Sequence, residues 1–600
     1  MATAQPRRSP RLAALRTRVL VAAVRLVPTE AQRLLVLTAA IGVVCGLVAV
    51  AFHEAIRIAE SNLISRAVEG RGPGWIAWTL ALPTLGGLVV GVLLAKLFPN
   101  ARGSGIPQVK ATFAGKASRV RLRDSVAKFF LSTMQIGSGA SLGREGPTVQ
   151  ICAGIATALG RLARVSPQAQ RRLLPVGVAA GVAAAFNAPI AAVTFTIEEI
   201  VGKLDEAVLS GVILAAALAA VIERSILGEH PVFDVPGHYG LDDARSLALY
   251  AALGIAAAVV SVVFTDLLLG LRMRFRKLAR VPEWARPALG GLVTGALAVG
   301  VISATGTTGV TGGGYSSLRL ALSGDLGLRV MLLLCVAKIL ATSFSYSSGG
   351  AGGIFAPTLF IGAMLGGAFG SLDMWLFGHP PSTLGAFALV GMGAVFSGTI
   401  RAPMTSVLII VEMTSGYGLI LPLMIANMSA YLLARRVRPS TIYEALLAQD
   451  GITFEKGYLV EALERMTLSD LVVRDRPFVS FEPSASASDV LRRTSEPSWQ
   501  DVFPVLDEDA RMVGVITNEE LRILAAEPEL GLIVNAADLM RPPVGVAHDE
   551  ALRKAFETMR VEGIRELPVL DADRRIIGFI DEGALAHAYL EASGPRSPRA

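Results

Sequence analysis

The sequence predicts an α-helical polytopic membrane protein with a duplicated membrane domain and broken helices, followed by a soluble α/β tandem. Three observations support this prediction. Hydrophobic residues form 52% of the 600 residues and charged residues only 18%, a composition typical of polytopic membrane proteins. Short motifs recur in the same order in two parts of the apolar region. After Arg438, charged residues become frequent and apolar runs shorten to strand length, which indicates a second domain.

The N-terminal segment is basic and lacks the features of a signal peptide. Residues 1–32 contain no early apolar core with a small-residue cleavage site. We therefore expect a cytoplasmic segment that carries an amphipathic helix on the membrane surface. Other basic clusters flank apolar stretches at 102–123, 272–280 and 435–438. The positive-inside rule places these loops in the cytoplasm, and this interpretation is favoured over binding of nucleic acid.

The membrane domain is expected at residues 33–445. A bilayer-spanning helix needs about 20 apolar residues, and the stretches at 34–58 and 247–271 reach that length. Other apolar stretches are interrupted by Gly or Pro, at 103–107, 143–147, 187–189, 349–357 and 401–403. Interrupted helices are tolerated only where their backbone faces protein or a water-filled cavity. They therefore indicate a transport pathway built from helix ends.

The apolar region repeats itself in two blocks. The first block places Gly143, Pro147, Thr148, Ile151 and Ala153 at the same spacing as Gly353, Pro357, Thr358, Ile361 and Ala363. The second block matches Gly177, Pro189, Val193 and Glu198 with Gly391, Pro403, Val407 and Glu412. Duplicated halves with broken helices are typical of transporters whose site lies where half-helices meet. The pattern does not distinguish an inverted repeat from a parallel one.

The C-terminal region predicts two similar α/β units at residues 466–592. The strand-like runs 503–506 and 512–516 recur at 567–570 and 576–580. A helical stretch precedes and follows each pair of runs, which predicts a tandem of β-α-β-β-α units of about 60 residues each. We expect a linker at 446–465 and a disordered tail at 593–600.

The motif at residues 103–107 (GSGIP) opens a helix after an apolar span. Glycine lets the backbone turn, and the following amides, at Gly105 and Ile106, are donors at the positive end of the helix dipole. Such an end binds an anion without a fixed cation, and Ser104 adds a hydroxyl donor. The alternative interpretation is that Ser104 is an ordinary helix-capping serine.

The motif at residues 143–147 (GREGP) is a second helix start within the apolar region. A carboxylate at Glu145 would compete with an anion for the helix end, and protonation would release it. The alternative is that Glu145 only complements the helix dipole. The repeat partner at 352–357 (GGIFAP) has apolar residues instead, so only its backbone amides, including those of Ile354 and Phe355, could serve an anion.

Glu198 and Glu199 end another apolar helix. Adjacent helical residues point about 100° apart, so we expect only one of the two to face a proton route. Glu412 repeats Glu198, which favours a structural role for that pair. Glu199 has no repeat partner and is the better candidate for proton transfer.

No enzyme signature is present in the sequence. The six His are scattered singly, and there is no zinc spacing, P-loop or Ser/His/Asp grouping, so we expect neither an enzyme nor a metal site. Cys45, Cys152 and Cys335 lie in apolar stretches and are interpreted as packing residues.

The three motifs and Tyr443, taken together and in this order, resemble the CLC family of chloride channels and chloride/proton antiporters. The resemblance covers about residues 30–445. It implies an inverted-repeat fold and a homodimer with one pore in each subunit. The tail looks like the tandem CBS (Bateman) module that many members of the family carry.

The resemblance also implies an anion site. The hydroxyls of Ser104 and Tyr443 would bind the central anion together with the amides of Ile354 and Phe355. Serine at position 104 resembles the members that prefer chloride, so chloride is the expected substrate. Lys128 and Phe195 also stand at positions familiar from the family.

In the same way, the resemblance implies roles for two glutamates. Glu145 matches the external gating glutamate, and Glu199 matches the internal proton-transfer glutamate that antiporters commonly have. The expected partners are therefore chloride, protons and the lipid bilayer. We expect a multi-pass protein of a bacterial inner membrane with both termini in the cytoplasm.

The tail departs from the pattern of adenosine-binding CBS modules. In such modules an Asp often stands three residues after a Thr, whereas here Thr517 is followed by Glu520, and the second unit has Asp581 and Ala584. Two interpretations stay open. One is a weak adenine-nucleotide site at Thr517 and Glu520, and the other is a purely structural dimerisation module without a cofactor.

Three functional hypotheses follow. Glu145 and Glu199 together favour a chloride/proton antiporter. A passive chloride channel on the same scaffold is the first alternative, and it differs only in coupling. A CBS-regulated cation channel or a sensor that transports nothing is a third hypothesis, which is disfavoured because helix N-termini repel cations.

Overall fold

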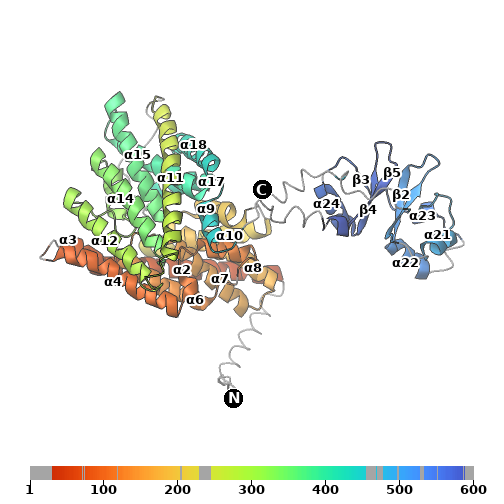
Figure 1. Cartoon of the computed structure of the whole chain (residues 1–600), viewed down its shortest axis with the longest axis horizontal. Coiled ribbons are helices and arrows are strands. Elements are labelled where there is room, and N and C mark those ends of the chain that lie inside the picture. Colours follow the sequence, from red (N-terminus) through yellow and green to blue (C-terminus); the bar gives the residue numbers. More distant parts are fainter. Residues whose placement is uncertain are drawn as a thin grey trace, which may run out of the picture. The chain divides into compact units, whose positions relative to one another are not determined.

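The computed structural model describes residues 30–69, 72, 74–117, 119–202, 206–228, 243, 245–453, 468, 477–495, 499–526, 533–550, 552–585 and 587. The chain divides into two compact units, with the boundary between Thr453 and Phe454 (Figure 1). The amphipathic helix expected before residue 30, most of the expected linker 446–465 and the expected tail 593–600 lie outside the described residues.

The first unit is helical and consists of two halves. The first half contains α2 (Glu30–Glu60), η1 (Ser61–Ser65), α3 (Arg66–Glu69), α4 (Trp75–Lys96), η2 (Pro99–Ala101), α5 (Ile106–Phe113), α6 (Leu122–Gly137), α7 (Glu145–Leu162), α8 (Pro167–Phe186), α9 (Pro189–Phe195), η3 (Thr196–Val201) and α10 (Glu206–Leu227). The second half contains α11 (Ser246–Arg276), α12 (Arg286–Thr305), α13 (Tyr315–Leu322), α14 (Leu328–Ser347), α15 (Phe355–Phe377), α16 (Ser382–Ile400), α17 (Pro403–Thr414), α18 (Ile420–Val437) and α19 (Ile442–Gln449).

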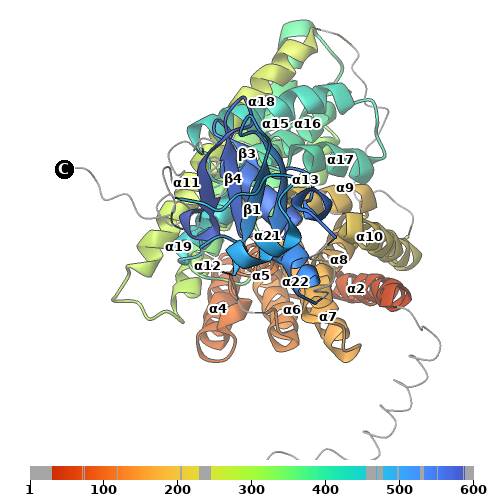
Figure 2. The ribbon, with the colours of Figure 1, turned by 90° about the vertical axis from the view of Figure 1, so that its right-hand side faces the viewer.

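The two halves repeat each other element by element. Helices α4 to α9 correspond in order to α12 to α17, and Figure 2 shows α4, α6 and α7 in one group and α15 to α18 in another. The correspondence extends to backbone detail. Both α8 and α16 end at a non-glycine residue in the left-handed region, Asn187 (φ 51°) and Arg401 (φ 71°). An Ala-Pro pair then starts the next helix in each half. The duplication read from the sequence is therefore a structural repeat.

Eight described helices are long and apolar enough to span a membrane. In α15 and α16, 83% and 94% of the apolar window is buried, so these two helices form the interior of the unit. They cross at Gly362 and Gly391, where a Cβ on either residue would lie 2.2 Å from the carbonyl oxygen of the other. In contrast, α5, α9 and α13 have only eight, seven and eight residues, which is too short to cross a bilayer. The predicted combination of full spans and broken helices is confirmed.

The second unit contains two small sheets. In one, β1 (Val502–Leu506) pairs antiparallel with β2 (Met512–Thr517). In the other, β4 (Glu566–Leu570) lies between β3 (Val546–Ala547) and β5 (Ile576–Asp581). Among the described residues of this unit, the helices are α21 (Ala487–Thr494), α22 (Asn518–Ala526), α23 (Ala536–Leu539) and α24 (Leu552–Glu562). Both hairpins have a register shift at the same place, between Val505 and Leu506 and between Val569 and Leu570. The predicted pair of similar α/β units is therefore present.

Candidate functional site

The three motif turns are joined to one another by backbone hydrogen bonds. The amide of Gly103 donates to the carbonyl oxygen of Gly350 (2.9 Å), and the amide of Gly352 donates back to Gly103 (3.2 Å). Gly143 and Gly353 exchange two hydrogen bonds of 2.7 Å each. Residues that are far apart in the sequence, and come from both halves, therefore meet at one place inside the membrane unit.

Each of these turns leads directly into a helix, so three helix N-termini lie close together. The helices are α5, α7 and α15. The approach is tight, because a Cβ at Gly146 on α7 would lie 2.4 Å from the Oγ of Ser104 and 3.3 Å from the Cα of Gly353. The amides of a helix N-terminus carry partial positive charge. Three such ends at one place make a strong binding site for an anion.

Two buried hydroxyls are left without a partner beside these helix ends. The side chains of Ser104 and Tyr443 are both 0% exposed, and neither hydroxyl has a hydrogen-bond partner within the part of the chain that the structure describes. A buried polar group without a partner costs about 1–3 kcal/mol, and such groups in a folded protein usually meet a ligand, ion or water. Both hydroxyls can donate a hydrogen bond to an anion.

The N-terminus of α15 is held in place by aromatic rings. The ring of Phe355, the first residue of α15, lies 4.8 Å from the ring of Phe186, 5.7 Å from that of Phe195 and 4.4 Å from that of Phe396. All four rings are buried. This packing fixes the amides of Ile354 and Phe355, which the sequence placed in the predicted anion site.

Glu145, the first residue of α7, is 1% exposed. Its carboxylate accepts hydrogen bonds from the hydroxyl of Tyr315 (2.7 Å) and from the amide of Ala356 in the first turn of α15 (3.3 Å). The carboxylate thus lies against the helix N-terminus at which an anion would be stabilised. Tyr315 is fixed in turn, because the guanidinium of Arg144 lies over its ring at 5.5 Å.

Glu199 lies in the π-helical segment η3 and is 3% exposed. Its carboxylate is 2.7 Å from the ammonium of Lys110, which also lies 3.4 Å from the carboxylate of Glu444. Glu444 directly follows Tyr443 in α19. The structure therefore brings Glu199 close to the two segments that carry the unpartnered hydroxyls, α5 with its preceding turn and α19.

Glu198 has a different environment from its neighbour. Its carboxylate accepts hydrogen bonds from the amides of Met404 (3.1 Å) and Thr405 (2.9 Å) at the start of α17. Glu412 does the same for Ile190 (3.0 Å) and Ala191 (2.7 Å) at the start of α9. The two glutamates stabilise each other's helix N-termini across the repeat, as is favourable for anionic groups there. This is the structural role that the repeat predicted for them.

Two buried lysines occupy equivalent positions in the two halves. Lys128 on α6 donates to the carbonyl oxygens of Ala101 (2.9 Å) and Gly103, before α5. Lys338 on α14 donates to the carbonyl oxygens of Gly309, Val310 and Gly312, before α13. Each lysine fixes the turn from which a short helix begins, so Lys128 supports the Ser104 turn and Lys338 supports the segment before Tyr315.

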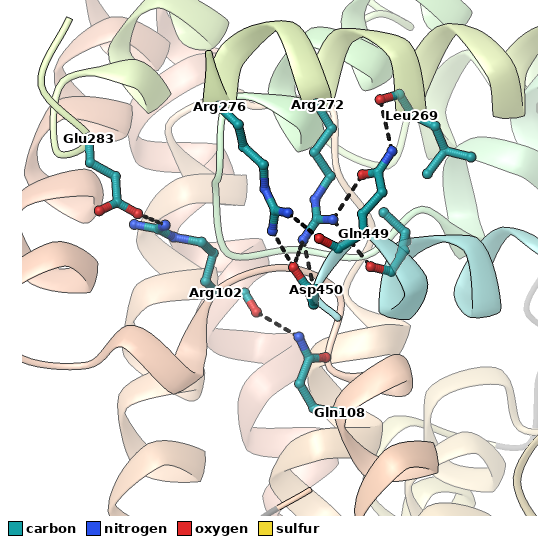
Figure 3. Close-up of polar contacts among 9 residues, drawn as sticks. Arg102, Gln108, Leu269, Arg272, Arg276, Glu283, Gln449 and Asp450 are labelled. Atoms are coloured by element: carbon teal, nitrogen blue, oxygen red, sulfur yellow. Dashed lines mark hydrogen bonds and ion pairs between the residues drawn. The ribbon is translucent and has the colours of Figure 1, made fainter. Parts of the chain in front are cut away.

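The helix that carries Tyr443 is anchored at its C-terminal end by two arginines of α11. Figure 3 shows Arg272 and Arg276 converging on Asp450, and Arg272 also reaching Gln449. The contacts from Arg272 to the Asp450 carboxylate are 2.8 and 3.0 Å long. Gln449 in turn donates to the carbonyl oxygen of Leu269 (3.1 Å). These contacts hold α19 against α11 and thereby fix the position of Tyr443.

In the second unit, the two residues considered for binding an adenine nucleotide, Thr517 and Glu520, are hydrogen-bonded to each other. The carboxylate of Glu520 accepts hydrogen bonds from the amide (2.9 Å) and hydroxyl (2.6 Å) of Thr517 and forms an ion pair with Arg541. Burial opposes ionisation of Glu520, but the hydrogen bonds from Thr517 and Arg541 outweigh it and lower the pKa of Glu520 from its ordinary value. In this structure Glu520 is thus already engaged by its own chain.

Sequence reasoning missed three residues of this site: Tyr315, Lys110 and Glu444. Tyr315 follows a run of three glycines, in a turn that resembles the one before α5, and this similarity was the available signal. Lys110 belongs to the basic cluster at 102–123, which was interpreted as a flank of the membrane span. That interpretation is wrong for Lys110, whose side chain is only 13% exposed and is paired with carboxylates.

Comparison with known proteins gives matches for both units. The family model described as voltage-gated chloride channel matches residues 86–435, and that of the CBS domain matches residues 468–527 and 536–591. The H(+)/Cl(-) exchange transporter ClcA of Salmonella agona (strain SL483) is 34% identical over 428 residues, which cover 69% of this chain and 88% of that protein. The transporter of the same name from Salmonella typhimurium is 33% identical over 428 residues, with the same coverage of both chains.

Solved structures agree with these matches. The structure of a slow cyanobacterial Cl⁻/H⁺ antiporter is similar with a TM-score of 0.63 and 27% identity, covering 70% of this chain and 98% of that one. The structure of a eukaryotic CLC transporter is similar with a TM-score of 0.60 and 20% identity, and the match covers 92% of this chain and 98% of that one. At this identity the similarity shows the fold alone. The predicted fold, a duplicated helical membrane domain followed by a tandem CBS region, is confirmed.

Proposed function

The chain belongs to the voltage-gated chloride channel (CLC) family, as a multi-pass membrane protein with a tandem CBS region, and we propose that it is a chloride/proton antiporter. The observation that carries this proposal is the meeting of three helix N-termini beside two buried hydroxyls without partners. A carboxylate that can be protonated lies against one of these helix ends. The relatives at 33–34% identity are named as H(+)/Cl(-) exchange transporters, which supports exchange over a passive channel.

In the proposed mechanism, chloride binds between the hydroxyls of Ser104 and Tyr443. The amides of Ile354 and Phe355 at the start of α15, and those of Gly105 and Ile106 at the start of α5, stabilise its charge through the helix dipoles. No fixed cation is needed, so chloride is held loosely enough to leave again. The aromatic packing around Phe355 keeps the amides oriented while the anion passes.

Glu145 is proposed to be the external gate. When ionised, its carboxylate competes with chloride for the N-terminus of α15, where the amide of Ala356 binds it. A proton from the external solution neutralises the carboxylate, the amide then loses its charged acceptor, and chloride takes its place. Because each opening requires a proton on Glu145, anion movement and proton movement are linked.

Glu199 is proposed to be the internal proton-transfer residue. It is buried, ionisable and unmatched in the repeat, whereas Glu198 is committed to the start of α17. A proton taken up from the cytoplasm would leave Glu199 for Glu145 while chloride moves in the opposite direction. The alternative function, a passive chloride channel, requires no such transfer and would leave Glu199 with a structural ion pair.

The first experiment measures chloride efflux and external pH together, with the purified protein in chloride-loaded liposomes. We expect an outward chloride gradient alone to drive protons inward, against their own gradient. Chloride efflux without proton movement would replace the antiporter by a channel, and the absence of any chloride flux would contradict transport altogether.

The remaining features are proposals that rest on the family and on the charge pattern. We propose a homodimer in a bacterial inner membrane, with both termini in the cytoplasm, with the membrane domain at 33–445 and the tail at 466–592. An adenine nucleotide bound at Thr517 and Glu520 would have to displace Arg541 from the Glu520 carboxylate. For this reason we favour a structural role for the tail.

One variant tests how the gate is held. Replacing Tyr315 with Phe removes the hydroxyl that donates to Glu145 but keeps the ring under Arg144. The ionised carboxylate loses a hydrogen bond of about 1.5–3 kcal/mol, so it accepts a proton more readily. We expect chloride flux, measured over a series of pH values, to persist to higher pH than in the unmodified protein, because the ionised gate is held less firmly.

The matched control is Tyr417→Phe, because Tyr417 is 74% exposed and has no part in the site. Its pH profile should equal that of the unmodified protein. A Tyr315→Phe profile identical to both would show that this hydroxyl does not hold the gate.

A further inference from the structure

A pocket of about 240 Å³ lies beside the residues that hold Glu145. Its charged and titratable lining side chains are His53, Arg57, Glu60, Arg144, Tyr315 and Arg319. The first three lie on one face of α2, because residues three and four apart are neighbours on a helix. The others come from the turn before α7 and from α13 of the second half. One face of α2 is therefore in reach of the side chains around the gate.

A chain of contacts leads from His53 in this pocket to the carboxylate of Glu145. The guanidinium of Arg144 donates a hydrogen bond to Nδ1 of His53. The same guanidinium lies over the ring of Tyr315 at 5.5 Å, and the hydroxyl of Tyr315 donates to Glu145 (2.7 Å). His53 thus stands three contacts away from the proposed gate.

His53 is the acceptor that fixes Arg144. In the part of the chain that the structure describes, the guanidinium makes one other hydrogen bond, a long one of 3.5 Å to the carbonyl oxygen of Ala185, and its buried Nε has no partner. A guanidinium has donors only, so Nδ1 of His53 carries no proton in this contact. Without this acceptor, little would hold the guanidinium over the Tyr315 ring.

The other charged groups around this contact cannot take over the role of His53. Those that act on His53 besides Arg144 are Glu54 and Arg57, which are hydrogen-bonded to each other (2.9 Å). Glu60 and Glu223 act on Arg144 through their charge, but among the described residues neither accepts a hydrogen bond from it. Their charge attracts the guanidinium to this region, and His53 sets its orientation.

From this chain of contacts we propose that His53 is a positioning residue for the gate. It fixes Arg144 over Tyr315 and so supports the hydrogen bond that holds the ionised Glu145 carboxylate. Loss of the acceptor lets Arg144 and Tyr315 move, which weakens a hydrogen bond that favours the ionised form. The gate then accepts a proton more readily. The inference rests on the proposed gating role of Glu145 and applies to a channel as well as to an antiporter.

The experiment compares His53→Leu with His53→Asn in chloride-loaded liposomes, recording chloride efflux over a series of pH values that are equal on both sides. Leucine and asparagine have the same branched shape, but only asparagine has an oxygen that can accept from Arg144. We expect chloride efflux in His53→Leu to persist to higher pH than in the unmodified protein. His53→Asn should restore the original profile. Efflux at acidic pH, where the gate is protonated in every variant, shows that each protein is folded.

The same pair of substitutions in an Arg144→Met background tests the route. Without the guanidinium, Leu and Asn at position 53 should give the same profile. Equal profiles for the two single variants would mean that His53 only fills space, and a difference that persists in the Arg144→Met background would mean that it acts by another route. Either result overturns the proposal. If His53→Leu does not fold, Arg144→Met alone tests the chain, because an unchanged profile would also overturn it.

The readout is chloride efflux alone, so this test is independent of proton coupling. Absence of coupled proton movement in the unmodified protein would overturn the antiport function and leave the comparison of His53→Leu with His53→Asn intact. Chloride efflux in the unmodified protein that does not change with pH would instead overturn the gating role of Glu145, and with it the role of His53.

Discussion

In liposomes that contain the Glu145→Gln variant, chloride efflux should continue while coupled proton movement falls to the level of protein-free liposomes. The Tyr315 hydroxyl and the Ala356 amide donate to different oxygens of the carboxylate. In glutamine the amide oxygen can accept from Ala356, while the NH2 group can donate to the hydroxyl oxygen of Tyr315. The substitution therefore preserves the size and shape of the side chain. What it removes is the negative charge that competes with chloride and the group that carries the proton.

The measurement is the same joint record of chloride efflux and external pH that tests the function. Glu198→Gln is the matched control, because Glu198 is a neighbouring glutamate whose carboxylate accepts from backbone amides of Met404 and Thr405. We expect Glu198→Gln to keep proton coupling. Uphill proton movement in the Glu145→Gln protein would contradict the gating role, and loss of coupling in both variants would show that the assay reports damage to the fold.

The parts of the site that could be predicted from the sequence are those encoded in local patterns. The turns at 103–107, 143–147 and 352–357 could be found because glycine and proline mark the breaks between helices. The repeat separated Glu198, which has a counterpart at Glu412, from Glu199, which has none. These inferences need only short-range spacing and a comparison of the chain with itself.

The parts that could not be predicted depend on contacts between distant segments. Tyr315 and Glu145 are 170 residues apart in the sequence, and Lys110 and Glu444 are 334 apart. Hydrophobic periodicity shows which face of a helix is buried, but not which residue of another half faces it. The role of a basic residue was equally ambiguous. From the sequence, Lys110 looks like any basic residue near a membrane surface, and only the structure shows its carboxylate partners.

The same dependence on close contacts predicts a large effect at Gly146, where α7 meets the Ser104 turn. A Cβ added there would lie 2.4 Å from the Oγ and 2.7 Å from the carbonyl oxygen of Ser104. The backbone oxygen cannot move away without shifting the start of α5, so Gly146→Ala should displace the hydroxyl proposed to bind chloride. Overpacking of this kind costs about 1–3 kcal/mol, which, if it falls on the anion site, corresponds to a loss of chloride affinity of about five- to 150-fold.

Calorimetric titration of the purified protein with chloride measures this effect, and chloride flux in liposomes should fall with it. The control is Gly300→Ala, because Gly300 also lies within a helix, α12, and a Cβ there would have open space around it. That variant should bind chloride normally. Normal chloride affinity in a folded Gly146→Ala protein would mean that the anion does not bind at the Ser104 hydroxyl, and the site would then have to lie along the helix N-termini of α7 and α15 alone.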